Sequence, residues 1–150
     1  MVSLKQRITD ETKAALLGGD RFVGETLRNL KAAILNEEVA RNQREEGLGD
    51  EDVEKVIARE VKKRTESARL YRENDRPELA KPEEQEMEVL KRFLPQQLGE
   101  DELRGLVTEK IASLGVSGPQ AMGQVIGALK QELGNTVDGA MLARIVKEKL

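Results

Sequence analysis

The stretch MGQVIGALKQELGNTVDGAMLARIVKEKL, residues 122–150, contains the pattern that decides the fold. Its apolar residues recur every three or four positions, which predicts two helices joined by a short turn. Gly134 can end the first helix, and Asp138 can cap the second. Gly123 and Gly127 are four positions apart, so they lie on one face of the first helix. This end of the chain is therefore expected to be a packed helical pair.

The remaining sequence is also helical in pattern, because no alternating β-branched run is long enough to compete. The expected N-caps are Ser3, Asp20, Asp50 and Asp138. Helices are predicted over 4–17, 21–43, 51–74, 78–94, 100–114, 119–133 and 139–150. Pro82 would kink the fourth of these helices or start it. The predicted fold is all-α, with a four-helix N-terminal domain over 1–95 and a small three-helix C-terminal bundle over 96–150.

The composition excludes several kinds of chemistry. The 150 residues include no histidine and no cysteine, so Ser-His-Asp and Cys-His nucleophile systems, Cys/His zinc sites and disulfides are excluded. The sequence also lacks a P-loop and a GxGxxG motif, so no nucleotide cradle is indicated. We therefore expect no catalytic residue, no metal and no cofactor.

The hydropathy pattern bears on location. No apolar run approaches the length of a membrane span, and the opening residues MVSLKQRITDE contain no hydrophobic signal region. The expected location is cytoplasmic, without a membrane partner.

Charge is distributed unevenly along the chain. The net charge is −3, yet residues 53–76 carry eight basic and five acidic side chains, a local net charge of +3. Residues 77–110 have a net charge of −4, and residues 111–150 a net charge of +1. Any contact with a nucleic acid must therefore use a local patch.

A row of basic side chains is expected on the third helix, opposite its apolar stripe. It consists of Lys55, Arg59, Lys62, Lys63 and Arg69. Such a row can follow a phosphate backbone, or it can be a solvated face with i,i+4 ion pairs. No aromatic residue lies within it, which argues against base stacking. A bound RNA would therefore be a folded, double-helical surface recognised by shape and phosphates.

Glu37 and Arg64 project into the apolar faces of the second and third helices. An unpaired charge on a core face costs on the order of several kcal/mol. The pattern therefore predicts a buried or half-buried ion pair between Glu37 and Arg64 that fixes the register of the two helices.

Gly123, Gly127 and Lys130 lie along the flank of the apolar stripe of the sixth helix. A glycine inside a helix costs about 1 kcal/mol relative to alanine. Two glycines at this spacing suggest close approach to the backbone. The approaching group is either a neighbouring helix or an RNA ribose-phosphate strand, and the spacing alone does not choose between them.

Four short motifs are distributed over nearly the whole chain. The first comprises Arg28, Lys31, Ala32 and Glu37. The second comprises Arg59, Glu60, Lys62, Arg64, Ser67 and Ala68. The third comprises Glu83, Glu86, Leu90, Phe93, Leu94, Pro95, Gln97 and Leu98. The fourth comprises Met122, Gly123, Val125, Ile126, Gly127 and Leu129. Together they resemble the GatB/YqeY (YqeY-like) family, and the last part is similar to the tail domain of the GatB subunit of tRNA-dependent amidotransferases.

The turn over 134–139 departs from the family pattern. It reads GNTVDG, where the family often has KGRADG. Asn135 stands where glycine is common, and asparagine tolerates the left-handed conformation. Thr136 replaces a basic residue, which weakens the case for a phosphate contact at this turn.

The resemblance implies a role in handling tRNA. GatB takes part in ATP-dependent amidation of misacylated tRNA with glutamine as the amido donor, a carbon–nitrogen ligase reaction, and its catalytic cradle is a separate domain. The tail domain contacts the tRNA. Since this chain has no cradle, the resemblance implies a tRNA-binding accessory module without catalysis of its own. Amidotransferase subunits are a second implied partner, and DNA is not expected. The alternatives are an amidotransferase partner subunit or a protein-interaction adaptor without RNA contact.

Overall fold

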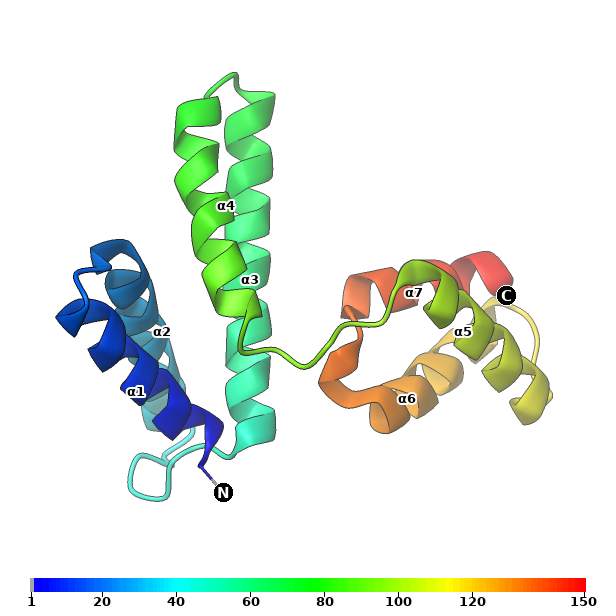
Figure 1. Ribbon diagram of the computed structural model, residues 1–150. Helices are drawn as coiled ribbons and strands as arrows, with labels where there is room; N and C mark the ends of the chain where they lie inside the picture. Colours follow the sequence, from blue (N-terminus) through cyan, green and yellow to red (C-terminus); the bar gives the residue numbers. More distant parts are fainter. Residues whose placement is uncertain (1) are drawn as a thin grey trace. The chain divides into compact units, whose positions relative to one another are not determined.

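A computed structural model describes residues 2–150 of the chain. Within that range the fold contains seven α-helices, two short 3-10 helices and no strand, so the all-α prediction is confirmed (Figure 1). The α-helices are α1 (Leu4–Leu17), α2 (Arg21–Ala40), α3 (Asp50–Glu73), α4 (Pro77–Lys91), α5 (Glu100–Leu114), α6 (Met122–Leu133) and α7 (Gly139–Lys149). The 3-10 helices are η1 (Pro119–Ala121) and η2 (Gly134–Thr136), on either side of α6. No helix in this range is both long and apolar enough to cross a membrane.

The chain forms two compact units, one ending at Leu94 and the other beginning at Pro95. In the first unit α1 packs against α2 and α3 packs against α4, while α2 also contacts both helices of the second pair. These contacts bury one apolar cluster. Its members are Leu4, Ile8, Leu27, Leu30, Ile34, Leu48, Val53, Val56, Ile57, Val89, Leu90 and Phe93.

Three of the four expected helix caps are present. Oγ of Ser3 accepts a hydrogen bond from the N–H of Gln6, and the carboxylates of Asp20 and Asp138 cap α2 and α7. The expectation for Asp50 is wrong, because Gly49 is the N-cap of α3. The Asp50 carboxylate instead accepts a 2.9 Å hydrogen bond from the N–H of Leu4. The first N–H groups of α1 lack partners within their own helix, so they attract this carboxylate.

Several helix ends differ from the prediction: α4 ends at Lys91 instead of residue 94, and α6 begins at Met122 after a 3-10 turn instead of at residue 119. Helix α2 ends at Ala40, three residues before the predicted end, and Asn42 then adopts a left-handed backbone with φ of 57°. Helix α4 begins at Pro77 and contains Pro82, so Pro82 does not start the helix. A proline at the first helical position is favourable because its missing N–H would have no intrahelical partner.

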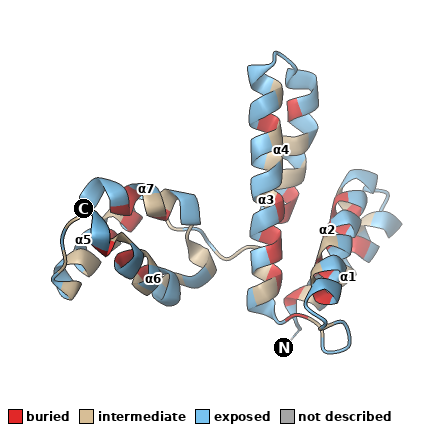
Figure 2. Cartoon of the chain, turned by 180° about the vertical axis from the view of Figure 1, so that it is seen from behind, coloured by how far each residue is buried: buried red, intermediate tan, exposed pale blue. Residues whose placement is uncertain are grey.

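The hairpin of α3 and α4 extends past the apolar cluster. Helix α3 has 24 residues, which gives it a length of about 36 Å. In the outer half, the buried apolar positions are the small residues Ala68 and Ala80, while Leu70 and Leu79 are 47% and 38% exposed (Figure 2). The guanidinium of Arg72 pairs there with a carboxylate of α4. Charge pairs and alanine contacts therefore replace a core at this end.

The second unit packs α5, α6 and α7 around a smaller apolar cluster. Its buried members are Leu103, Val107, Val125, Leu129, Leu142, Ile145 and Val146. The segment before α5 is fastened to the turn after α6, because the N–H of Leu98 donates to the carbonyl of Thr136 at 2.8 Å. Ion pairs of Arg104 with Glu148 and of Arg144 with Glu100 join α5 to α7.

Candidate nucleic-acid interface

The basic row on α3 is exposed, but most of its charges have carboxylate partners. The partners are Glu51 for Lys55, Glu37 for Arg59, Glu60 for Lys63, and both Glu66 and Glu73 for Arg69. Lys62 is exposed, and its positive charge contributes to lowering the pKa of Glu66. The row therefore resembles a solvated face in which acidic and basic groups balance each other.

Arg69 illustrates this balance. Its guanidinium donates to Glu66, one turn earlier, and to Glu73, one turn later. The hydrogen bonds with these two carboxylates raise the pKa of Arg69, and the hydrogen bond from Arg69 lowers the pKa of Glu66. A phosphate would have to displace both carboxylates to bind this guanidinium fully.

The predicted direct pair between Glu37 and Arg64 is wrong, although both side chains are largely buried and paired. Glu37 accepts hydrogen bonds from Arg59 at 2.9 Å and Arg41 at 3.3 Å, and these bonds, that of Arg59 first, lower its pKa. Arg59 precedes Arg64 by five residues, about 7.5 Å along the helix. Because Glu37 lies near the end of α2, beside the loop leading to α3, it meets the earlier arginine.

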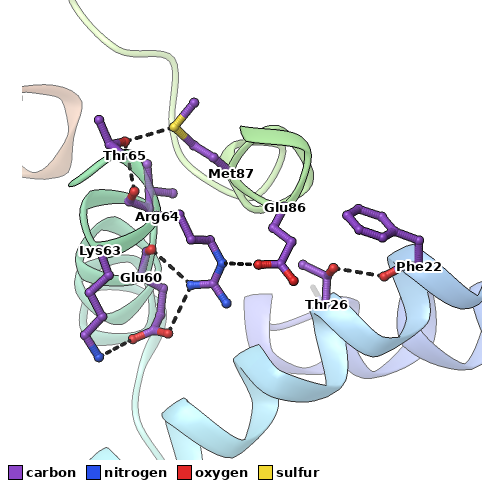
Figure 3. A network of polar contacts seen from close by, with 9 residues as sticks. Phe22, Thr26, Glu60, Lys63, Arg64, Thr65, Glu86 and Met87 are labelled. Atoms are coloured by element: carbon purple, nitrogen blue, oxygen red, sulfur yellow. Dashed lines mark hydrogen bonds and ion pairs between the residues drawn. The ribbon is translucent and has the colours of Figure 1, made fainter. Parts of the chain in front are cut away.

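Arg64 instead holds together α3 and α4 (Figure 3). Its Nη1 donates to the carbonyl of Glu60 at 3.0 Å and to the carboxylate of Glu60 at 3.2 Å, and its Nε donates to Glu86 at 3.1 Å. Burial raises the pKa of Glu60, but hydrogen bonds from Lys63 and Arg64 outweigh it and lower the pKa. The i,i+4 spacing of Glu60 and Arg64 is the sequence signal that indicates their contact.

Glu38 is a buried carboxylate on α2, next to Glu37, and was not predicted from the sequence. Its side chain is 2% exposed, lies 2.6 Å from Nζ of Lys5 and accepts a 2.8 Å hydrogen bond from the N–H of Leu48. Burial raises the pKa of Glu38, while the hydrogen bonds from Lys5 and Leu48 bring it below its ordinary value. Glu38 follows Ile34 by one helical turn, so it lies at the border of the apolar face, and its burial depends on α1 and on the loop before α3, which pack over it.

The glycine face of α6 is defined here by Gly123, Gly127 and Lys130. All three residues are exposed. A Cβ added at either glycine would have no heavy atom of the described chain within 4 Å, apart from the helix itself and adjacent residues. A neighbouring helix of this chain therefore does not account for the two glycines.

Lys130 lies at the end of the glycine face. A Cβ added at Gly139 would lie 3.9 Å from Nζ of Lys130, so the lysine side chain extends to the turn before α7. No ion pair of Lys130 occurs among the salt bridges of residues 2–150. The arrangement therefore combines bare helix backbone with a cation available to an external anion.

The described residues do not form an alternative metal centre. No three carboxylates in residues 2–150 come together in a way that could hold a metal ion. The acidic side chains discussed above are instead engaged with arginines and lysines, which is their structural role.

The sequence matches a known protein family over nearly its whole length. The sequence model described as Yqey-like protein matches residues 5–150. Among curated proteins, none matches this chain. Because the family match extends over nearly the whole sequence, the chain belongs to the YqeY-like family.

Proposed function

We propose that this protein is a binding module for folded RNA, with tRNA as the ligand, and that it carries out no reaction of its own. The glycine face of α6 is the proposed contact surface. The observation that carries the proposal is the open space over Gly123 and Gly127.

The two glycines weaken α6 unless something compensates for them. Each costs about 1 kcal/mol relative to alanine in a helix interior. Nothing in the described chain packs closely against them. An external ligand that approaches the backbone would explain their presence, because a Cβ at either position would hold it away. A ribose-phosphate strand is such a ligand, since protein contacts to RNA commonly go to phosphates and 2′-hydroxyls.

The few charges around this face predict that electrostatic attraction contributes only weakly to RNA binding. Lys130 supplies one cation, and residues 111–150 have a net charge of only +1. We therefore expect a few phosphate contacts and a shallow salt dependence. The α3 row is the second candidate surface, but most of its cations already bind carboxylates. The scarcity of aromatic residues, 2% of the chain, favours recognition of RNA shape over base stacking.

The setting follows from the resemblance to the GatB tail domain. We place the protein in the cytoplasm, where it would serve tRNA-dependent amidotransferase or another tRNA-handling enzyme. Carbon–nitrogen ligase activity is not assigned to the chain alone, because no described residue set suits that reaction.

The test compares glycine substitutions in full-length protein. Fluorescence anisotropy with a labelled tRNA transcript measures the dissociation constant of wild type and of the double variant Gly123→Gln/Gly127→Gln. Gly105→Gln is the matched control, because Gly105 is also an exposed glycine inside a helix of the same unit with open space over it. We expect the α6 double variant to bind about tenfold more weakly and the control to bind normally.

The ligand class is tested with the same assay. Single-stranded poly(U) and duplex DNA of equal length replace the tRNA, and both should bind more weakly than tRNA. Absence of tRNA binding by the wild-type protein contradicts the proposal. An equal loss in the Gly105→Gln control also contradicts it, because the effect would not be specific to α6.

A further inference from the structure

A groove between α1 and α2 contains a cavity of about 290 Å³. Its lining residues are Lys5, Thr9, Lys31, Ala32, Ile34, Leu35 and Glu38. The apolar floor comes from α2, and the two lysines come from different helices. This volume is below the usual range for a drug-sized ligand but can receive one large side chain.

An exposed apolar stripe continues from the cavity along α2. Ala32, Leu35 and Val39 follow one another at helical spacing, so they lie on one face. Leu35 is 42% exposed to solvent and Val39 is 57% exposed. The opposite side of α2 contributes Leu27, Leu30 and Ile34 to the core. The stripe is therefore not part of the apolar core of the first unit.

The charges next to the stripe are predominantly positive. Lys31 lines the cavity, and Arg28 is exposed one turn before Ala32 on the same face. The carboxylate in the lining, that of Glu38, is already compensated by Lys5 and by the N–H of Leu48. A partner that places acidic groups beside the stripe would be electrostatically complementary to it.

We propose that the groove of α1 and α2 docks an acidic amphipathic helix of a partner protein, with one large apolar side chain of that helix in the cavity. Residues at i and i+3 or i+4 of a helix match the spacing of Leu35 and Val39 on the facing surface. The backbone of α2 is hydrogen-bonded within the helix, so the groove has no free edge to which an extended strand could pair. The apolar floor provides no hydrogen-bond donors for phosphate oxygens, which disfavours RNA as the occupant. This surface belongs to the first unit and is independent of the glycine face.

The first experiment uses a display library of helical peptides on purified full-length protein. The peptides share one apolar stripe, and their flanking positions are randomised between Glu and Lys. We expect selection of peptides with Glu at the flanks. The best peptide should bind about tenfold more weakly to Leu35→Glu and to Lys31→Glu than to wild type.

Two substitutions serve as matched controls. Leu70→Glu changes a leucine of similar exposure on α3, and Lys81→Glu changes an exposed lysine on α4. Both should leave peptide binding within about twofold of wild type. Circular dichroism melting of each variant checks the fold. The tRNA affinity of Leu35→Glu should be unchanged, which separates failure of this proposal from failure of the RNA-binding proposal.

The second experiment tests the occupant in cells. A photo-crosslinking amino acid at position 35 should attach to a protein segment whose sequence is acidic and amphipathic at helical spacing, and a synthetic peptide of that segment should bind wild type but not Leu35→Glu. Crosslinks to RNA or to a second copy of this chain overturn the proposal. Selection of Lys-flanked peptides, or equal weakening by Leu70→Glu, also overturns it.

Discussion

The carboxylate of Glu38 on α2 lies 2.6 Å from Nζ of Lys5 on α1, and the same oxygen accepts a hydrogen bond from the N–H of Leu48. One buried carboxylate thus connects α1, α2 and the loop before α3. The Glu38 side chain is 2% exposed and the hydrogen bond from Leu48 is buried, whereas the Lys5 side chain is 42% exposed to water.

This connection predicts a pH-dependent contribution to stability. The pKa of Glu38 is lowered in the folded protein, so its contribution is present above the ordinary carboxyl pKa and is lost as pH falls through the lowered value. Glu38→Gln should lower the free energy of unfolding by on the order of 1–3 kcal/mol at pH 7. The difference from wild type should shrink below about pH 4, since protonated Glu resembles Gln. Urea unfolding of both proteins at several pH values between about 4 and 7 measures this difference in the free energy of unfolding. A difference that does not change with pH would contradict the role assigned to the charge of Glu38.

Alanine should have opposite effects on stability at Gly123, inside α6, and at Gly115, which ends α5. Gly123→Ala should raise the free energy of unfolding by about 0.5–1 kcal/mol, because alanine favours the helix and its Cβ meets open space. Gly115→Ala should lower it by about 1–2 kcal/mol, because Gly115 caps α5 with a φ of 64°. Chemical denaturation measures both changes. Destabilisation by Gly123→Ala would show that the backbone of α6 is packed more closely than described.

The Arg64 network predicts a strong coupling between α3 and α4. Arg64→Met should lower the free energy of unfolding by on the order of 2–4 kcal/mol, because it leaves the carboxylates of Glu60 and Glu86 without a largely buried partner. A double-mutant cycle with Glu86→Gln isolates the pair. The cycle of Arg72 and Glu84 is the control, since that pair joins the same helices with side chains 53% and 40% exposed. The coupling energy of the exposed pair Arg72–Glu84 should be below about 1 kcal/mol. Equal coupling energies for this pair and for Arg64–Glu86 would show that burial does not strengthen the Arg64 pair.

The proposed RNA contact predicts different salt dependences for two lysine variants. Lys130→Gln should reduce the slope of log K against log salt by about 1, as expected for one lost phosphate contact. Lys62→Gln, on the balanced row of α3, should leave the slope unchanged. Anisotropy titrations with tRNA at several salt concentrations provide the slopes. A reduced slope for Lys62→Gln together with an unchanged slope for Lys130→Gln would contradict the contact at α6 and assign the RNA-binding surface to α3.

The helices could be predicted because their signals are local. Apolar periodicity, the caps Ser3 and Asp20 and the stop at Gly115 depend on residues within a few positions of each other. The partners of Glu37 and Arg64 on other helices, Arg59 and Glu86, could not be predicted, since they depend on the register of α3 against α2 and against α4. Burial of both side chains could be predicted, because each lies on an apolar face.

The candidate site was predictable to a different extent. Spacing alone identified Gly123 and Gly127 as unusual, but it does not reveal whether their close neighbour belongs to the same chain. Only the packing of α5, α6 and α7 shows that the space over these glycines is open. The basic row of α3 was visible in the sequence, while its compensation by Glu37 across the helix pair required tertiary structure.

The hairpin of α3 and α4 has a consequence for dynamics. Ala68 and Ala80 are buried but small, so they bury little apolar area, and the exposed leucines nearby contribute little to holding the two helices together. The outermost turns can therefore unwind and reform while the base of the hairpin remains intact. We therefore expect the amide hydrogens of these outermost turns to exchange with solvent through local opening well before those beside Val53 and Leu90.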